Sequence, residues 1–360
     1  MDSLIADAMR NSPQNAQQPA EQNAADLAPY EIQIKVVGCG GAGTNCVSRL
    51  AQMGIKSAET IALNTDAKHL KIVNADKKIL IGDTLTKGLG AGGFPEIGMK
   101  AAEQSKDKIR DALNGAELVF ICAGMGGGTG TGAAPIVARE AKAQGAITVG
   151  MVTYPFALER ARLDKADWGL DALKEACDTV VIIDNNRLVQ FVPNLPMNQA
   201  FAVADTLVAK AVKGIADTVM LPSLMNIDFA DLRMIMGNAG TAMISVGEAQ
   251  GSNRVTDVIQ STLAHPLLDV DYTGSKGALI LISGGSNLSL GDAVKVGEGI
   301  TESFADNAYV KWGARIQPEL ENKIVVTAVL TGVTSPHIVG RDIAHRNKAK
   351  EAIGLEAMVF

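Results

Sequence analysis

The sequence contains the glycine-rich segment Gly126-Gly127-Gly128-Thr129-Gly130-Thr131-Gly132, shortly after the apolar run Leu118-Val119-Phe120-Ile121-Cys122. Glycines let a backbone approach a phosphate with no Cβ in the way, and they point successive N–H groups at it. A helix predicted to begin at about Ala133 would add the positive end of its dipole, and Thr129 and Thr131 would add hydroxyl donors. No lysine follows as in a Walker-type P-loop, so the segment predicts a phosphate site of another kind.

Two further glycine-rich segments accompany the first. Gly38-x-Gly40-x-x-Gly43 follows a predicted strand and opens a predicted helix, as in a dinucleotide fingerprint. Leu85–Gly93 is too rich in glycine for a regular element and could close over a terminal phosphate. Two phosphate loops at adjacent strand ends suit a polyphosphate. The alternatives are glycines that only permit close packing and, for Leu85–Gly93, a mobile surface loop.

Apolar runs alternate with helical patterns through the first half of the chain, which predicts a parallel sheet with helices on both faces. The predicted strands are Ile34–Val37, Thr60–Leu63, Leu118–Cys122, Ile147–Val152 and Thr179–Ile183.

The longest helical pattern covers residues 197–219, where apolar side chains recur at helical spacing. Such a helix is suited to bridging two domains. Ala278–Ile282 and Lys323–Leu330 are predicted strands of a smaller α+β domain. The predicted organisation is listed in chain order: flexible extension 1–30, Rossmann-like α/β nucleotide domain 31–196, central helix 197–220, C-terminal domain 221–335 and flexible tail 336–360.

The composition excludes several classes of protein. The chain has 360 residues, 47% hydrophobic and 20% charged, enough to bury a large core. A net charge of −6 and only 4% aromatic residues disfavour a nucleic-acid binder. Four cysteines without a CxxC pair predict a reduced, cytoplasmic protein with buried thiols. We expect neither a signal peptide nor a transmembrane segment.

A set of motifs resembles the FtsZ family of tubulin-like GTPases. The segment 126–132 is the tubulin signature as that family carries it. Around it, in the family's order and spacing, are Asn64-Thr65-Asp66, Thr86–Gly92, Pro155-Phe156 and Asn226–Asp231. The resemblance covers about residues 32 to 335 and implies a tubulin/FtsZ-like fold. The N-terminal extension and Leu267–Asp271 are most similar to archaeal members.

The resemblance implies a site for GTP or GDP. The residues implied at the phosphates are Gly40, Gly41, Gly43 and Asn45 at the diphosphate, Ala91 and Gly92 at the γ-phosphate with Asn64 and Asp66 nearby, and Gly126, Gly127, Gly128, Thr129 and Gly130 at the α- and β-phosphates.

The resemblance also implies the residues at the nucleoside. Glu159 and Arg162 would face the ribose, and Asn185, Phe201 and Asp205 would hold guanine. A carboxylate accepts from guanine N1–H and N2–H₂, a donor pair that adenine lacks. From the residues alone, Phe201 could equally be part of a core stripe, and Asp205 a solvated helix position.

Catalysis is implied for Asn226, Asp228 and Asp231. In the family this loop projects onto the γ-phosphate of the next subunit, where the carboxylates position water and help place Mg²⁺ held mainly by the nucleotide phosphates. No separate protein metal site is expected. The alternative is that Asp228 and Asp231 only cap the following helix.

The resemblance implies head-to-tail homopolymers that act in cell division, in the cytoplasm at the division site. A basic tail ending in apolar residues resembles tails that bind membrane-anchoring division proteins. Two other readings remain: a GTP-binding scaffold that does not hydrolyse, and an NAD-dependent oxidoreductase, for which His265 would be a poor lone base.

Three positions depart from the family pattern. Pro155–Arg162 lacks a glycine and is one residue short, so either Arg160 or Arg162 could supply the basic group. Phe94 replaces an asparagine, and Asp184 replaces a proline.

Overall fold

The computed structural model describes residues 32–220, 223–225, 227–237, 239–264 and 270–334. These residues belong to one compact unit that begins at Ile32. The predicted extension and tail, and the predicted catalytic Asn226, lie outside the described residues. The domain boundaries predicted inside this unit stay predictions.

The first half alternates strands and helices. Its elements are β1 (Ile34–Cys39), α2 (Gly40–Gln52), β2 (Glu59–Asn64), α3 (Ala67–Ile72), β3 (Lys77–Leu80), α4 (Asp83–Thr86), α5 (Pro95–Gln104), α6 (Lys106–Leu113), β4 (Leu118–Gly124), α7 (Thr129–Ala143), β5 (Ile147–Tyr154), the 3-10 helix η3 (Ala157–Glu159), α8 (Ala161–Ala176), β6 (Thr179–Asp184) and α9 (Asn185–Phe191).

A long helix then leads into the second half. The remaining elements are α10 (Met197–Met220), α11 (Phe229–Met236), β7 (Gly240–Gln250), α12 (Arg254–Leu263), β8 (Gly277–Gly284), α13 (Leu290–Thr301), β9 (Tyr309–Ile316), the 3-10 helix η4 (Pro318–Leu320) and β10 (Lys323–Thr331). None of the helices among the described residues is long and apolar enough to cross a membrane.

The strands form one sheet in the order β3-β2-β1-β4-β5-β6-β7-β10-β8-β9. The first six are parallel, as predicted, and their chain order reverses between β1 and β4. In doubly wound sheets, ligands bind outside the carboxyl ends of the strands at such a reversal. Cys39 pairs with Ala123 there, so both glycine-rich segments begin side by side at this edge.

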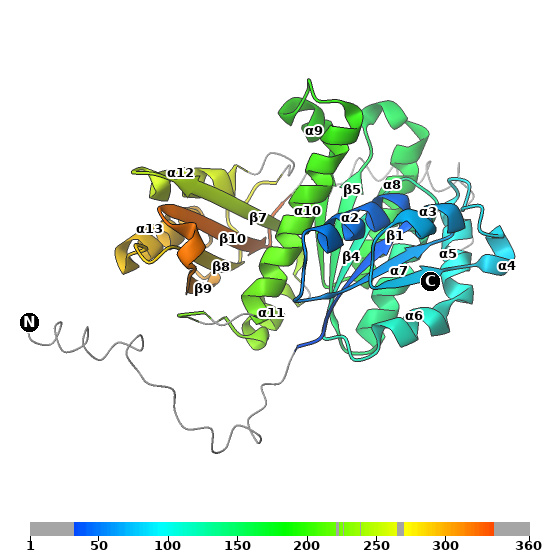
Figure 1. Ribbon diagram of the computed structural model, residues 1–360, viewed down its shortest axis with the longest axis horizontal. Coiled ribbons are helices and arrows are strands. Elements are labelled where there is room, and N and C mark those ends of the chain that lie inside the picture. The colour runs from blue at the N-terminus through cyan, green and yellow to red at the C-terminus, as the bar shows by residue number, and fades with distance from the viewer. Residues whose placement is uncertain (1–31, 221–222, 226, 238, 265–269, 335–360) are drawn as a thin grey trace, which may run out of the picture. The chain divides into compact units, whose positions relative to one another are not determined.

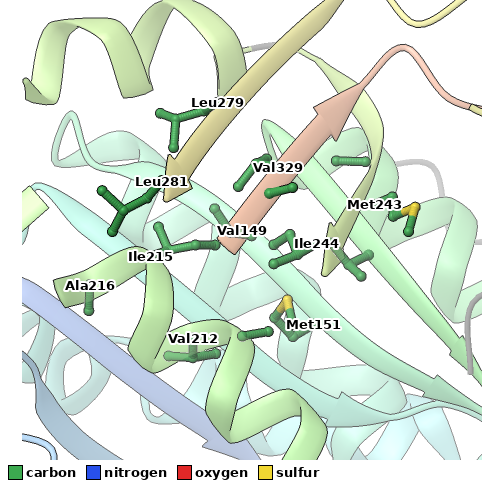
Figure 2. Close-up of a cluster of buried hydrophobic side chains, with 14 of the residues drawn as sticks. Val149, Met151, Val212, Ile215, Ala216, Met243, Ile244, Leu279, Leu281 and Val329 are labelled. Atoms are coloured by element: carbon green, nitrogen blue, oxygen red, sulfur yellow. The ribbon is translucent and has the colours of Figure 1, made fainter. Parts of the chain in front are cut away.

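Helices cover both faces of the parallel part (Figure 1). One apolar cluster joins β-strand residues to side chains of α5, α6, α7 and α8. The other joins the opposite face to α2 and α10 and continues into β7, β8 and β10. Figure 2 shows where this second cluster meets α10, with Val212 and Ile215 beside Val149, Ile244 and Val329.

Helix α10 links the two halves through polar contacts as well. The hydroxyl of Ser57 donates to the carboxylate of Asp217 at 2.7 Å, and Arg315 donates to the carbonyl of Asp217 at 2.8 Å. Gly214 lies against β10, where an added Cβ would be 2.9 Å from the hydroxyl of Thr327. The predicted long helix is therefore present, and it is fixed on both sides.

The predicted start of the second glycine-flanked helix is wrong. Helix α7 begins at Thr129 and not at about Ala133, so Gly130 and Gly132 lie in its first turns. A Cβ at Gly132 would lie 2.1 Å from the carbonyl oxygen of Pro95. Glycine is a poor helix former, but this close approach of α5 requires it, and tertiary packing overrides propensity.

Candidate functional site

Two adjoining cavities open at the carboxyl ends of β1 and β4. One has a volume of about 610 Å³ and the other about 240 Å³. Ala42, Gly124 and Arg162 belong to the walls of both. Together the cavities follow the crevice where the strand order reverses.

The smaller cavity is lined by both glycine-rich segments. An added Cβ at Gly41 would meet no atom within 4 Å, and one at Gly127 would meet only the guanidinium of Arg162, at 4.0 Å. These two positions therefore present bare backbone to open space. Gly43 differs, because a Cβ there would lie 2.1 Å from the carbonyl oxygen of Cys122. The close-packing alternative is therefore correct for Gly43, whereas the phosphate-binding interpretation of Gly41 and Gly127 stays a prediction.

The first turns of α2 and α7 line this cavity, and neither helix has a side-chain cap at its amino end. Backbone N–H groups of a first turn have no partner within the helix, and they carry the positive end of the helix dipole. Thr129 lines the cavity, and its hydroxyl bonds that of Thr65 at 2.6 Å. The prediction that Thr131 adds a hydroxyl donor to the phosphate site is wrong. Its side chain is buried against Gly169 of α8, and its hydroxyl has no hydrogen-bond partner among the described residues. The arrangement suits a bound polyanion.

The larger cavity ends at a mostly apolar wall on α10. Phe201 lines it and is 38% exposed, with its ring edge-on to Phe156 at 6.0 Å between centroids. The alternative of a core position for Phe201 is therefore wrong. A flat ring that is open on one side can stack on a planar ligand.

Asp205 lies one turn further along α10 in the same wall. Burial raises the pKa of its carboxyl group to about 6, against a smaller opposing effect of Arg49. The carboxylate form therefore gains from a ligand that donates hydrogen bonds to it. Asn185, at the start of α9, lines the same cavity.

The turn between β5 and α8 fixes Glu159 and Arg162. Glu159 accepts from the backbone N–H of Phe156 at 2.9 Å and pairs with Arg162, which also donates to the carbonyl of Gly126 at 3.3 Å. Arg162 lines both cavities, whereas Arg160 lines neither. Arg160 has φ of 24°, the left-handed region that favours glycine, at the position where the family pattern has glycine.

The segment Leu85–Gly93 is tied down by hydrogen bonds. Gly90 donates to the carbonyl of Thr65 at 3.1 Å, and the Lys165 ammonium donates to the carbonyl of Gly93 at 2.6 Å. The Lys165 ammonium also lies 5.1 Å from the ring centre of Phe94, which is a cation–π contact. Phe94, which replaces the asparagine of the family pattern, therefore has a packing partner here. Ala91, which is buried, touches Gly128 across this junction.

Some predicted nucleotide residues lie outside both cavity walls. Asn64 is buried and bonds the backbone of Asp66, and Asp66 caps α3 through Lys68 and His69. The others outside the walls are Gly40, Ala91, Gly92 and Gly126. The replacement at Asp184 has a local reason, since its side chain accepts from the N–H of Asn186 at 2.8 Å and caps α9.

The acidic residues of α11 lie elsewhere. Asp228 is exposed and caps the helix, accepting from the N–H of Asp231 at 2.7 Å. Asp231 is buried, 8% exposed. Neither belongs to the wall of either cavity. The capping interpretation is thus correct for Asp228, and it leaves the carboxylate accessible.

The sequence interpretation missed the apolar wall of the larger cavity. Met197, Ala204 and Val208 of α10 line it, as do Cys46 and Cys122. Counting one turn back from Phe201 would have found Met197. A hydrogen bond with Cys122, together with burial, holds the pKa of Cys46 well above its usual value, so this thiol stays neutral.

Within the described ranges, no three His, Cys, Asp or Glu side chains converge in a way that could hold a metal ion.

Comparisons with known proteins agree with this geometry. A profile of the Tubulin/FtsZ family, GTPase domain, matches residues 33–193, and one of the FtsZ family, C-terminal domain, matches residues 240–334. The chain is 60% identical over 315 residues to cell division protein FtsZ 2 of Methanocaldococcus jannaschii, covering 87% of this chain and 83% of the relative. It is 47% identical to FtsZ 2 of Haloferax volcanii, covering 94% and 85%.

Solved structures show the same likeness. An empty FtsZ dimer of M. jannaschii superposes with a TM-score of 0.81 at 45% identity, over 88% of this chain and 93% of that one. A CetZ2 protofilament of H. volcanii shares the fold alone, with a TM-score of 0.74 at 22% identity over 91% of this chain and all (100%) of that one.

Proposed function

Since the chain belongs to the FtsZ family of tubulin-like cell-division GTPases, we propose that it binds GTP in the two cavities, assembles head to tail and hydrolyses GTP between subunits. It acts in the cytoplasm, where its filaments assemble at the division site.

One observation supports nucleotide binding best. The amino ends of two helices, each preceded by a glycine-rich segment, adjoin a cavity whose far wall carries an aromatic ring and a carboxyl group. Gly41 and Gly127 offer amides to the phosphates from adjoining strand ends. At the other end, Phe201 stacks on the guanine and Asp205 accepts from its N1–H and N2–H₂. Adenine would leave the buried carboxylate unpaired, which makes the site specific for guanine.

The remaining predicted contacts complete the nucleotide site. Gly40, Gly43 and Asn45 belong to the diphosphate region, and Gly126, Gly128, Thr129 and Gly130 to the α- and β-phosphates. Asn64, Asp66, Ala91 and Gly92 surround the γ-phosphate, and Asn185 contacts the base. Between Arg160 and Arg162, we assign the ribose-side role to Arg162, together with Glu159, because Arg162 lines both cavities.

A Mg²⁺ ion held mainly by the phosphates of the nucleotide would offset phosphate charge during transfer. This chain's own part is to orient the phosphates through backbone amides and to exclude water from the base end of the cavity.

Hydrolysis requires a second subunit in this proposal. Asp228 and Asp231 are absent from both cavity walls, and the carboxylate in the walls near the ribose, Glu159, is already paired with Arg162. Asn226, Asp228 and Asp231 of one subunit therefore meet the γ-phosphate held by the next. There a carboxylate orients the attacking water. The dimeric state of the M. jannaschii relative supports self-association.

The test is GTP hydrolysis against protein concentration in Mg²⁺, with right-angle light scattering. Specific activity should rise together with scattering above a critical concentration. Asp228→Asn keeps a good helix cap but removes the charge, so it should bind GTP and melt like the wild type while losing hydrolysis. Ser289→Ala removes the cap of α13 and is the matched control, with a lower melting temperature and normal hydrolysis.

Three outcomes would change the conclusion. Activity independent of concentration would mean that one subunit holds a complete site. Binding without hydrolysis at any concentration would favour the scaffold. GDP filaments that disassemble on dilution as slowly as GTP filaments would contradict a nucleotide-controlled interface.

The tail at 336–360 provides the membrane link in this proposal, through anchoring division proteins. Deleting residues 337–360 should leave GTPase activity intact and abolish recruitment to the division site. Normal localisation of the shortened chain would contradict that role.

A further inference from the structure

The buried acidic residue of α11 is held by a lysine from a distant strand. The ammonium of Lys311, on β9, lies 2.9 Å from Oδ1 of Asp231. The Asp231 side chain is 12% exposed and that of Lys311 is 42% exposed. The pair thus lies at the surface, near the exposed Asp228. We call the segment Ile227–Asp231, which carries both carboxylates, the acidic loop.

Strand β9 also supports the segment that precedes α11. Met225 donates to the carbonyl of Ala314 at 3.1 Å, and Ala314 donates back at 3.3 Å. A Cβ at Gly313 would lie 2.6 Å from the carbonyl oxygen of Met225. Alternate residues of a strand share a face, so Lys311 projects on the same side as Gly313, toward this segment.

Lys311 is the basic residue that forms an ion pair with Asp231. Arg233, the basic residue of α11, lies over the ring of Phe229 at 5.4 Å from its centre. Asp228 is engaged with the backbone of α11. Hydrogen bonding and attraction to Asp231, with a smaller effect of Tyr309, raise the pKa of Lys311, so it remains an ammonium ion at every pH of interest.

An acidic loop that approaches a triphosphate meets repulsion between like charges. We propose that Lys311 is a positioning residue of the hydrolysis site shared between subunits. It holds the Asp231 carboxylate in one orientation and offsets its charge as the loop meets the neighbour's γ-phosphate. This inference rests on the proposed function, and it divides the work of the loop: Asp228 is the accessible carboxylate, and Asp231 is the one fixed by a cation.

The test compares Lys311→Met and Lys311→Arg with Lys323→Met. Lys323 forms an ion pair of similar geometry, 2.8 Å from Glu248, in strands β10 and β7, away from the acidic loop. In polymer formed above the critical concentration, Lys311→Met should lower kcat roughly tenfold, as expected for a misplaced reacting group. GTP affinity of the dilute subunit should not change. Lys311→Arg should restore kcat to within about twofold, because arginine keeps the charge and the donors.

The Lys323→Met control should match the wild type in kcat and in GTP affinity, and melting curves should show every variant folded. A Lys311→Met chain with wild-type kcat, while the wild type still hydrolyses cooperatively, would overturn this inference alone. Loss of activity in both Lys311→Met and Lys311→Arg would also overturn it, since packing would then explain the effect. A wild type whose activity does not depend on concentration would overturn both this inference and the proposed function.

Discussion

Lowering the pH should weaken guanine nucleotide binding through a single carboxyl group. In the proposed complex, Asp205 would accept hydrogen bonds from guanine only when it is ionised. Burial raises the pKa of this group from 3.8 to about 6. Between pH 7 and pH 5 the free protein therefore passes from mostly ionised to mostly protonated at the base pocket. Protons and guanine compete for the same oxygen atoms.

The size of the effect follows from the ionised fraction. A carboxyl group with a pKa of about 6 is about 90% ionised at pH 7 and about 10% ionised at pH 5, so the affinity should fall about tenfold. With the ordinary value of 3.8 the ionised fraction would stay above about 90%, and the affinity would barely change.

The assay is titration of GDP into the nucleotide-free protein at several pH values, below the critical concentration for assembly. Phosphate groups of GDP also titrate in this range, so Asp205→Asn is measured beside the wild type with the same ligand. Their ratio isolates the carboxyl group. At pH 7 the variant should bind roughly 10- to 100-fold more weakly, the usual cost of losing hydrogen bonds to a charged acceptor.

Stability of the nucleotide-free chain should change in the opposite direction. The folded pKa of Asp205 lies above its unfolded value, so its favourable contribution is present below pH 3.8 and is lost as the pH rises through about 6. The melting temperature of the wild type relative to Asp205→Asn should therefore increase from pH 7 to pH 5. An affinity ratio that is constant across this range, or an Asp205→Asn variant that binds like the wild type, would refute the reasoning.

Three further predictions, made with four substitutions, test other features of the chain. Gly43→Ala would place a methyl group 2.1 Å from a β4 carbonyl oxygen, so it should destabilise the fold by roughly 2 kcal/mol or more in denaturant titration. Gly41→Ala should fold normally and weaken GDP binding. Equal stability of the two variants would contradict the packing argument. Lys165→Met removes the hydrogen bond to Gly93 in the segment Leu85–Gly93, which we place near the γ-phosphate. Affinity for a slowly hydrolysed GTP analogue should therefore fall several-fold, while GDP affinity stays unchanged. Equal losses for both ligands would argue against a γ-phosphate role. Arg160→Gly relieves a left-handed backbone and should stabilise the chain by about 1 kcal/mol; a lower melting temperature would show that the arginine side chain matters more than its φ of 24°.

Much of the fold could be predicted from the sequence because it depends on local patterns. Apolar runs of strand length, separated by helical patterns, predicted a parallel sheet that contains β1, β2, β4, β5 and β6. Glycines after two strands indicated phosphate loops, and the reversal of strand order brought those loops together at Cys39 and Ala123. The long pattern from residue 197 predicted α10 to within one residue at its end.

What the sequence could not give depends on neighbours far along the chain. Gly41 and Gly43 are the same residue type two positions apart, yet only β4 determines that one faces open space and the other a carbonyl oxygen. Arg162 lines both cavities and Arg160 lines neither, because of the turn that Glu159 closes. Asp231 received its cation from Lys311 on β9.

The sequence by itself therefore determined the order of the elements and the kinds of group that bind a nucleotide, since both are properties of short segments. The tertiary structure decided which glycine or arginine lines a cavity, which glycine is packed against another segment, and which carboxylate forms an ion pair. Burial, close approach and ion pairing arise only when separate segments meet, and these three effects give Asp205, Gly43 and Asp231 their roles.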